Sequence, residues 1–148
     1  VLGWPSAEYP NASSVILGGR GMLAGCGQLP FYWPTPDGYP DVKESWMAAA
    51  PTIERWNLAL ALCGASPNFK PRYLPASSTP PELTRAGAVL DHWIGRILGR
   101  PMLAADRATL VDFLTQGGTE GDSLTTAMRD RLGTTIALIL DSPYFLWR

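Results

Sequence analysis

The residues that could do chemistry begin with a glycine-rich run. Gly19-Arg20-Gly21-Met22-Leu23-Ala24 matches the Ala-ended spelling of the motif that holds a pyrophosphate at the N-terminus of a helix. That motif works inside a βαβ unit with an acidic residue at the end of the second strand. Here a segment rich in proline and aromatic residues follows instead. We therefore interpret the run as a helix face or bend that packs closely against a neighbour.

No other pattern in the sequence predicts catalysis. His92 is the only histidine, and its helical neighbour Asp91 points away from it, so that Asp91 cannot orient it as a base. Asp37 and Asp41 flank a turn, and turn capping accounts for both. The nucleophile-elbow and zinc-protease motifs are lacking from the sequence. We expect neither a catalytic residue nor a cofactor.

The two cysteines leave two alternatives open. Cys26 and Cys63 could form one disulfide in an exported protein, or they could be two small buried apolar residues, and we favour the second. With one histidine and no clustered spacing, these thiols do not predict a metal site.

Aromatic residues crowd the segment from Leu29 to Asp41, in which four prolines exclude a regular helix or strand. The candidate partner- or ligand-binding residues are Phe31, Tyr32, Trp33, Tyr39 and Trp46. Flat rings of this kind anchor protein partners or stack on sugars. The simpler interpretation, which we favour, is that the loop folds back and buries these rings on its own helices.

Three residues near this loop are expected to be structural. Asp37 and Gly38 follow Pro36 in a turn, since proline presets one dihedral angle and glycine accepts a positive φ. Arg55 is expected to hold a loop carboxylate or backbone carbonyls through its several donors.

The sequence predicts an all-α fold for the elements that position these residues. We expect about five helices, with the aromatic loop between the first two. Apolar residues recur at spacings of three and four, and no stretch alternates with a period of two. Residues Ser14, Ser45, Thr79 and Asp122 or Ser123 are predicted helix caps. The helices are expected at about 14–26, 45–62 with a new start at Pro51, 79–98, 104–116 and 122–140.

Composition limits the class of protein. The chain has 148 residues with a net charge of -1, so it lacks the basic excess that nucleic-acid partners require. No apolar run approaches the roughly 18 residues of a membrane-spanning helix. Twelve of the 14 prolines lie at or before Pro81. We expect one helical domain over 1–148, or the C-terminal part of a larger protein, with an extended lead-in at 1–14 and a connector at 65–81.

The loop and its surroundings resemble the bacterial family catalogued as domain of unknown function 1800. The resemblance rests on Gly27-Gln28-Leu29-Pro30-Phe31, Pro34, Gly38-Tyr39-Pro40, Trp46 and Arg55-Trp56-Asn57. It extends to Ser142-Pro143-Tyr144-Phe145, where Tyr144 replaces the family's usual Glu. It covers the chain from about Val15 to Arg148.

The resemblance implies a helical, exported bacterial protein, periplasmic or extracellular, of which this chain is the C-terminal part. Members are often encoded beside a sulfatase-like family. We therefore expect a non-catalytic structural or interaction module with a protein partner, such as the rest of the parent chain or other subunits of an assembly. The alternative is a hydrolase-associated or carbohydrate-binding module that acts with the sulfatase-like partner.

Overall fold

The computed structural model describes residues 12–29, 31–32, 36–40, 42, 44, 48–64 and 74–146, with the backbone alone over 12–18. This part of the chain is all-α and contains no β-strand, as predicted. Its five long helices are α1 (Ala12–Gly25), α2 (Ala49–Leu62), α4 (Ala86–Leu98), α5 (Ala104–Thr115) and α6 (Thr126–Leu140). Two single turns, α3 (Pro75–Ser78) and α7 (Pro143–Leu146), were not predicted.

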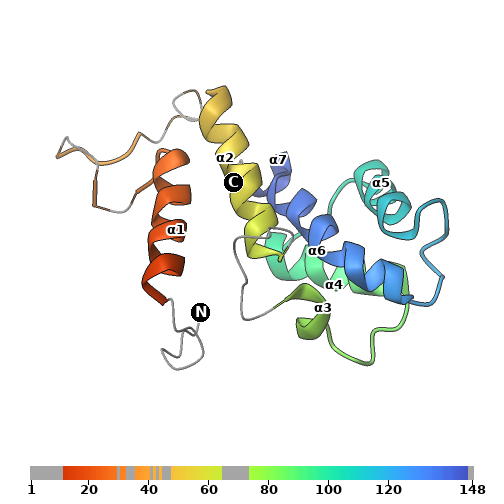
Figure 1. Cartoon of the computed structure of the whole chain (residues 1–148). Coiled ribbons are helices and arrows are strands. Elements are labelled where there is room, and N and C mark those ends of the chain that lie inside the picture. The colour runs from red at the N-terminus through yellow and green to blue at the C-terminus, as the bar shows by residue number, and fades with distance from the viewer. Residues whose placement is uncertain are drawn as a thin grey trace.

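Helix α6 lies at the centre of the fold and packs against α2, α3, α4, α5 and α7 (Figure 1). The core between these helices is aliphatic, and the largest fully buried side chains include Leu90, Leu114, Leu132 and Ile139. Burying a leucine stabilises the fold by roughly 1.5–3 kcal/mol. The residues from α4 onward therefore supply most of the core.

Helix α6 approaches the end of α2 very closely at Gly133. A Cβ atom at this position would lie 2.5 Å from the carbonyl oxygen of Cys63. Only glycine fits this contact without moving the backbone of one helix. Gly133 thus fixes the end of α2 against the core.

The start of α4 differs from the prediction, because Thr79 does not cap it. The Thr79 hydroxyl donates to the carbonyl of Pro75 and accepts from the indole of Trp93, so it joins α3 to α4. Helix α4 begins seven residues later. Its first N–H groups, those of Ala86 and Gly87, donate to the carbonyls of Asp122 and Glu120. Distant backbone thus does what a capping side chain would do.

The start of α6 also differs, since neither Asp122 nor Ser123 is its cap. The Asp122 carboxylate accepts from the N–H and hydroxyl of Thr119 and closes the preceding loop. Thr125 caps α6 instead, and its hydroxyl accepts from the N–H of Met128 at 3.2 Å. Asp122 therefore stabilises the loop before α6, and Thr125 stabilises the first turn of the helix.

Helix α1 lies at one side of the molecule and makes its main contact with α2 (Figure 1). The close packing predicted for its glycines is found at one described position. A Cβ atom at Gly25 would lie 3.0 Å from the side chain of Glu54, whereas one at Gly19 or Gly21 would meet open space. The glycine-rich run is therefore a lightly held helix, not a tightly packed one.

Candidate functional site

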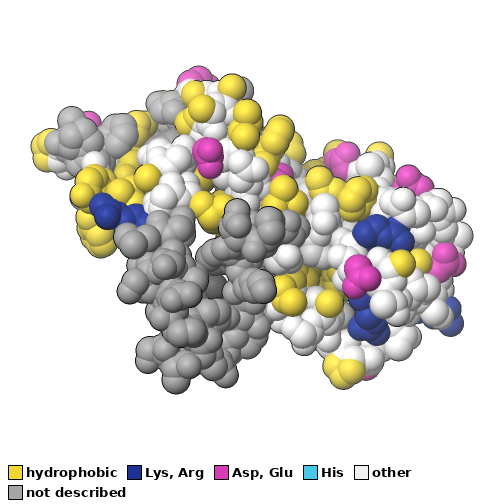
Figure 2. Space-filling model, viewed as in Figure 1, with side chains coloured by type: hydrophobic (Ala, Val, Ile, Leu, Met, Phe, Trp, Pro, Cys, Tyr) yellow, Lys and Arg dark blue, Asp and Glu magenta, His cyan; other side chains and the backbone are white. Residues whose placement is uncertain are grey.

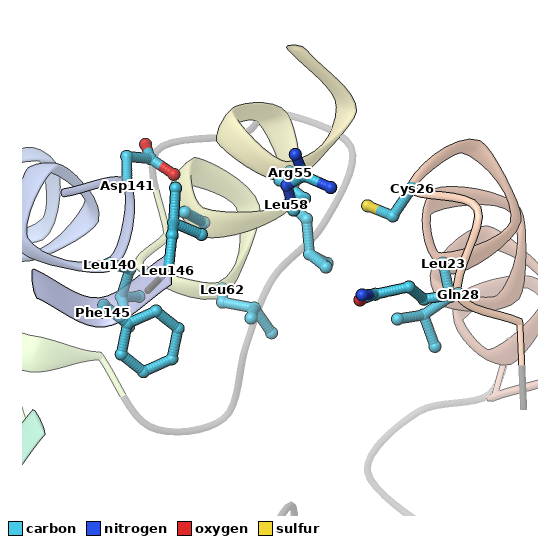
Figure 3. Close-up of a pocket in the computed structure, with 11 residues that line it drawn as sticks. Leu23, Cys26, Gln28, Arg55, Leu58, Leu62, Leu140, Asp141, Phe145 and Leu146 are labelled. Carbon is cyan, nitrogen blue, oxygen red and sulfur yellow. The ribbon is translucent and has the colours of Figure 1, made fainter. Parts of the chain in front are cut away.

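A pocket of about 450 Å³ opens where α1, α2 and the α6–α7 corner meet (Figure 3). Its walls are mostly aliphatic and come from all three elements: Leu23, Leu58, Ala59, Leu62, Leu140, Phe145 and Leu146. Four polar residues complete the lining: Cys26, Gln28, Arg55 and Asp141. Pockets of roughly 300–1,000 Å³ with this mixture are typical of binding sites.

Asp141 is the polar residue of this pocket whose chemistry is most altered. It follows the last turn of α6, and burial raises the pKa of its carboxyl to about 6. No other described group offsets this burial with a charge, and no ion pair of the described residues includes Asp141. The carboxylate thus carries its charge at pH 7 at the cost of partial desolvation.

Both cysteines are free and buried in the structure, so it does not join them in the disulfide that was one of the two alternatives. Burial raises the pKa of the Cys63 thiol to about 11, and the nearby Asp141 adds to the effect. Burial also raises the pKa of the Cys26 thiol, against an opposing effect of Arg55. Thiols with raised pKa values are poor nucleophiles, so neither is suited to covalent catalysis.

Arg55 lines the pocket from α2, next to Leu58 and across from Cys26 in Figure 3. Its Nη2 donates to the hydroxyl of Thr52 one turn earlier, at 3.1 Å. This bond orients the guanidinium along α2. The predicted role of Arg55, which is to hold a loop carboxylate or backbone carbonyls, stays a prediction.

The aromatic loop has two of its rings in solvent. Phe31 is fully exposed and Tyr32 is 66% exposed, so the interpretation that the loop buries these two rings is wrong. The guanidinium of Arg20 lies over the Tyr32 ring at 5.3 Å, within the range of a cation–π contact. Trp33 and Trp46 fall outside the described residues.

A short turn holds the two rings in place. The carbonyl of Leu29 accepts from the N–H of Tyr32 and from the hydroxyl of Tyr39. Phe31 lies between them with φ of +63°, a left-handed conformation that is rare for a bulky residue. The later turn contains an exposed Asp37 and a Gly38 with φ of +80°.

The C-terminal signature serves as a clamp. Tyr144 of α7 donates its hydroxyl to Asp106 at 2.5 Å and accepts from the N–H of Leu103 at 3.2 Å. Leu103 is the residue that precedes α5, so the phenol takes the place of a helix cap. Tyr144 is therefore structural here.

The described residues include no group of three or more His, Cys, Asp or Glu that could hold a metal ion. Within the same residues, none of the helices is both long and apolar enough to cross a membrane. His92 lies edge-on to Trp93, with ring centroids 5.6 Å apart, and is not one of the residues that line the pocket.

Sequence reasoning identified the aromatic loop but missed Asp141, Arg20 and the pocket. The pocket joins residues from opposite ends of the chain, and no local pattern marks such a meeting. One local signal for the pocket was present in the sequence: Asp141 is an acidic residue that directly follows an apolar stretch of helix.

Comparison with known proteins agrees with the loop and C-terminal signatures. No curated protein and no solved structure matches the chain. A family model matches residues 15–147, which is most of the sequence. The chain therefore belongs to the family described as protein of unknown function (DUF1800).

Proposed function

We propose that this chain is a non-catalytic interaction module, which uses the turn after α1 to bind a protein partner. The observation that carries the proposal is the exposure of Phe31 in a left-handed conformation. A bulky residue in that conformation costs of order 1–3 kcal/mol, and function is a common reason to retain such strain. Exposed aromatic residues are the side chains that most often anchor protein partners.

The surface around the turn supports the same function. Hydrophobic side chains gather over α2 and over the segment that follows α1 (Figure 2). On α2 the exposed residues include Ile53 and Trp56, which are one turn apart and therefore share a face. The chemistry of the pocket points the same way, because burial raises the pKa of its one thiol, that of Cys26, and makes it a poor nucleophile.

The parent protein is, in our proposal, an exported bacterial protein in which this module joins subunits or parts of one chain. This step rests on the family resemblance alone. Fractionation of the native cells tests it, with the periplasmic or extracellular fraction as the expected location. Recovery in the cytoplasm alone would contradict it.

Site-specific photocrosslinking tests the interaction. Phe31 is replaced by a benzophenone amino acid in the full protein, in its native cells, and Leu103 serves as the matched control because it is 69% exposed on another surface. We expect an adduct with a defined protein from position 31 that position 103 does not give. Identical or absent adducts at the two positions would contradict the proposal.

A carbohydrate-binding module that acts with a sulfatase-like partner is the second candidate. The exposed Phe31 and Tyr32 rings favour it, because aromatic faces also stack on sugars. A glycan array compares the chain with Tyr32→Ala. Binding that the substitution abolishes would support this candidate, whereas no binding, or binding unaffected by the substitution, would exclude it.

A further inference from the structure

We propose that the partner of this module is a second copy of the same chain, and that Phe31 of each copy enters the pocket of the other. The inference rests on the proposed interaction function and names its partner. It uses two surfaces that one chain carries together. The knob is defined as Phe31, Tyr32 and Arg20, and the hole is the pocket between α1, α2 and the α6–α7 corner.

The knob and the hole lie close together on the chain. Gln28 lines the hole, and Phe31 follows it after only three residues. Phe31 is nonetheless fully exposed, so it does not fill the hole of its own chain. Two copies related by a two-fold axis near the end of α1 would place each knob over the other hole. A two-fold interface requires this kind of self-complementarity.

The hole fits the apolar part of the knob. Its walls are aliphatic, with Phe145 at one edge, and Cys26 at the α1 side is almost completely buried (Figure 3). A volume of about 450 Å³ leaves room for an aromatic side chain and a neighbouring group. The ring of Phe31 would contact the leucines that Figure 3 shows around the opening.

The charges are complementary as well. The knob carries the cation of Arg20 over the Tyr32 ring, and the hole carries the carboxylate of Asp141. Arg55 is the cation of the hole, and it lies on the α2 side near Cys26, apart from Asp141 in Figure 3. Cys63 is the other titratable group close to Asp141, and α7 contributes only apolar side chains to the lining. Arg20 of one copy therefore has an anion to meet on the other.

The rings would bury the area of a weak dimer. An aromatic side chain buries about 150–250 Å², so four rings, two from each copy, would bury on the order of 600–1,000 Å². Stable protein–protein interfaces bury about 1,200–2,000 Å², and weak or transient ones bury less. The area therefore fits a dimer that forms and separates readily.

Analytical ultracentrifugation of the chain at about 1 to 100 μM tests the proposal, because a dissociation constant in this range is expected for an interface of this size. We expect a monomer–dimer equilibrium. Phe31→Ser should raise the dimer dissociation constant about 30-fold or more, as expected of a hot spot. Leu103→Ser, the exposed control, should change it less than about two-fold. A monomer throughout this range, or a dimer indifferent to Phe31→Ser, would overturn the proposal.

A charge exchange adds a second, independent test. Arg20→Glu and Asp141→Lys should each weaken the dimer, and the two together should restore it. Arg129→Glu, at an exposed arginine on α6, is the control for a change of net charge. Circular dichroism verifies folding, and if Asp141→Lys does not fold, Arg20→Glu against Arg129→Glu decides. Equal effects of those two variants would overturn the proposed pairing.

The outcome is separable from that of the proposed function. A chain that is monomeric in solution but gives a specific crosslink from position 31 to a different protein would overturn the second-copy proposal and leave the interaction function standing. A crosslink between two copies of the chain would support both.

Discussion

The region from residue 74 to 146 and the region of α1 with its loop are held together in different ways. The first region surrounds α6 and contains nearly all of the buried aliphatic core, including Leu90 and Leu132. The second has Cys26 as its one fully buried described residue, together with open space around Gly19. The comparison indicates that one region is packed into the core and that the other leaves much of its surface exposed.

Helix α2 connects the two regions, and its two faces show the same contrast. Ala59 and Cys63 belong to the core, whereas Trp56 is 47% exposed. The close contact of Gly133 with the end of α2 joins this helix to the core. The exposed ring of Trp56 is therefore carried by a helix that the core holds in place.

The largest expected difference comes from truncating one apolar side chain in each region. Leu90→Ala should lower the free energy of unfolding by about 2–5 kcal/mol, because it opens a cavity in the core. Phe31→Ala should change it by less than about 0.5 kcal/mol, since that side chain is fully exposed. Urea unfolding at low protein concentration measures both. Similar losses for the two variants would contradict the contrast.

Adding one methyl group to a glycine in each region should give effects of opposite sign. Gly133→Ala forces a Cβ atom against the Cys63 carbonyl and should cost about 1–3 kcal/mol or more. Gly19→Ala has open space inside α1 and should stabilise by up to about 1 kcal/mol. Thermal melts distinguish them. A destabilising Gly19→Ala would show that α1 is packed more tightly than we infer.

Asp141 gives the smallest expected effect, at the border between the regions. Its pKa is about 6 in the folded protein, above the ordinary 3.8, so the folded state favours the protonated form. Stability should therefore fall as the pH rises from about 4 to 7. Because the side chain is only partly buried, the loss should be on the order of 1 kcal/mol.

Asp141→Asn is the matched variant for this effect. It should remove this pH dependence and be more stable than the original chain at pH 7, because the amide carries no charge to desolvate. Urea unfolding at several pH values measures both chains. The opposite slope in the original chain would mean that a cation pairs with Asp141 in the folded monomer.

The sequence was sufficient for the features that depend on local chemistry. The all-α class follows from apolar spacing, and the ends of α4 and α6 follow from Gly99 and from the approach to Pro143. The starts of α4 and α6 were predicted wrongly because Thr79 bonds to Trp93 and Asp122 bonds to Thr119 instead of capping a helix. Several possible caps compete at such places, and tertiary contacts choose among them.

The sequence indicated one part of the candidate site, the aromatic loop, but not the other part, the pocket. The sequence shows that the loop is rich in aromatic residues. The exposure of Phe31, however, depends on how the loop packs against the helices, which the sequence does not show. The hole depends on Leu23, Leu62 and Asp141 coming together from three helices. Contacts between residues so far apart in the chain have no signature in a single sequence.

Hydrogen exchange at two protein concentrations tests the central claim most directly. At a concentration that favours the dimer, we expect slower exchange in α1, in the turn that contains Phe31, at the end of α2 and at the α6–α7 corner, with no change in α4 and α5. Exchange in α1 that is slow and independent of concentration would contradict the account, because α1 would then belong to the stable core of a single chain.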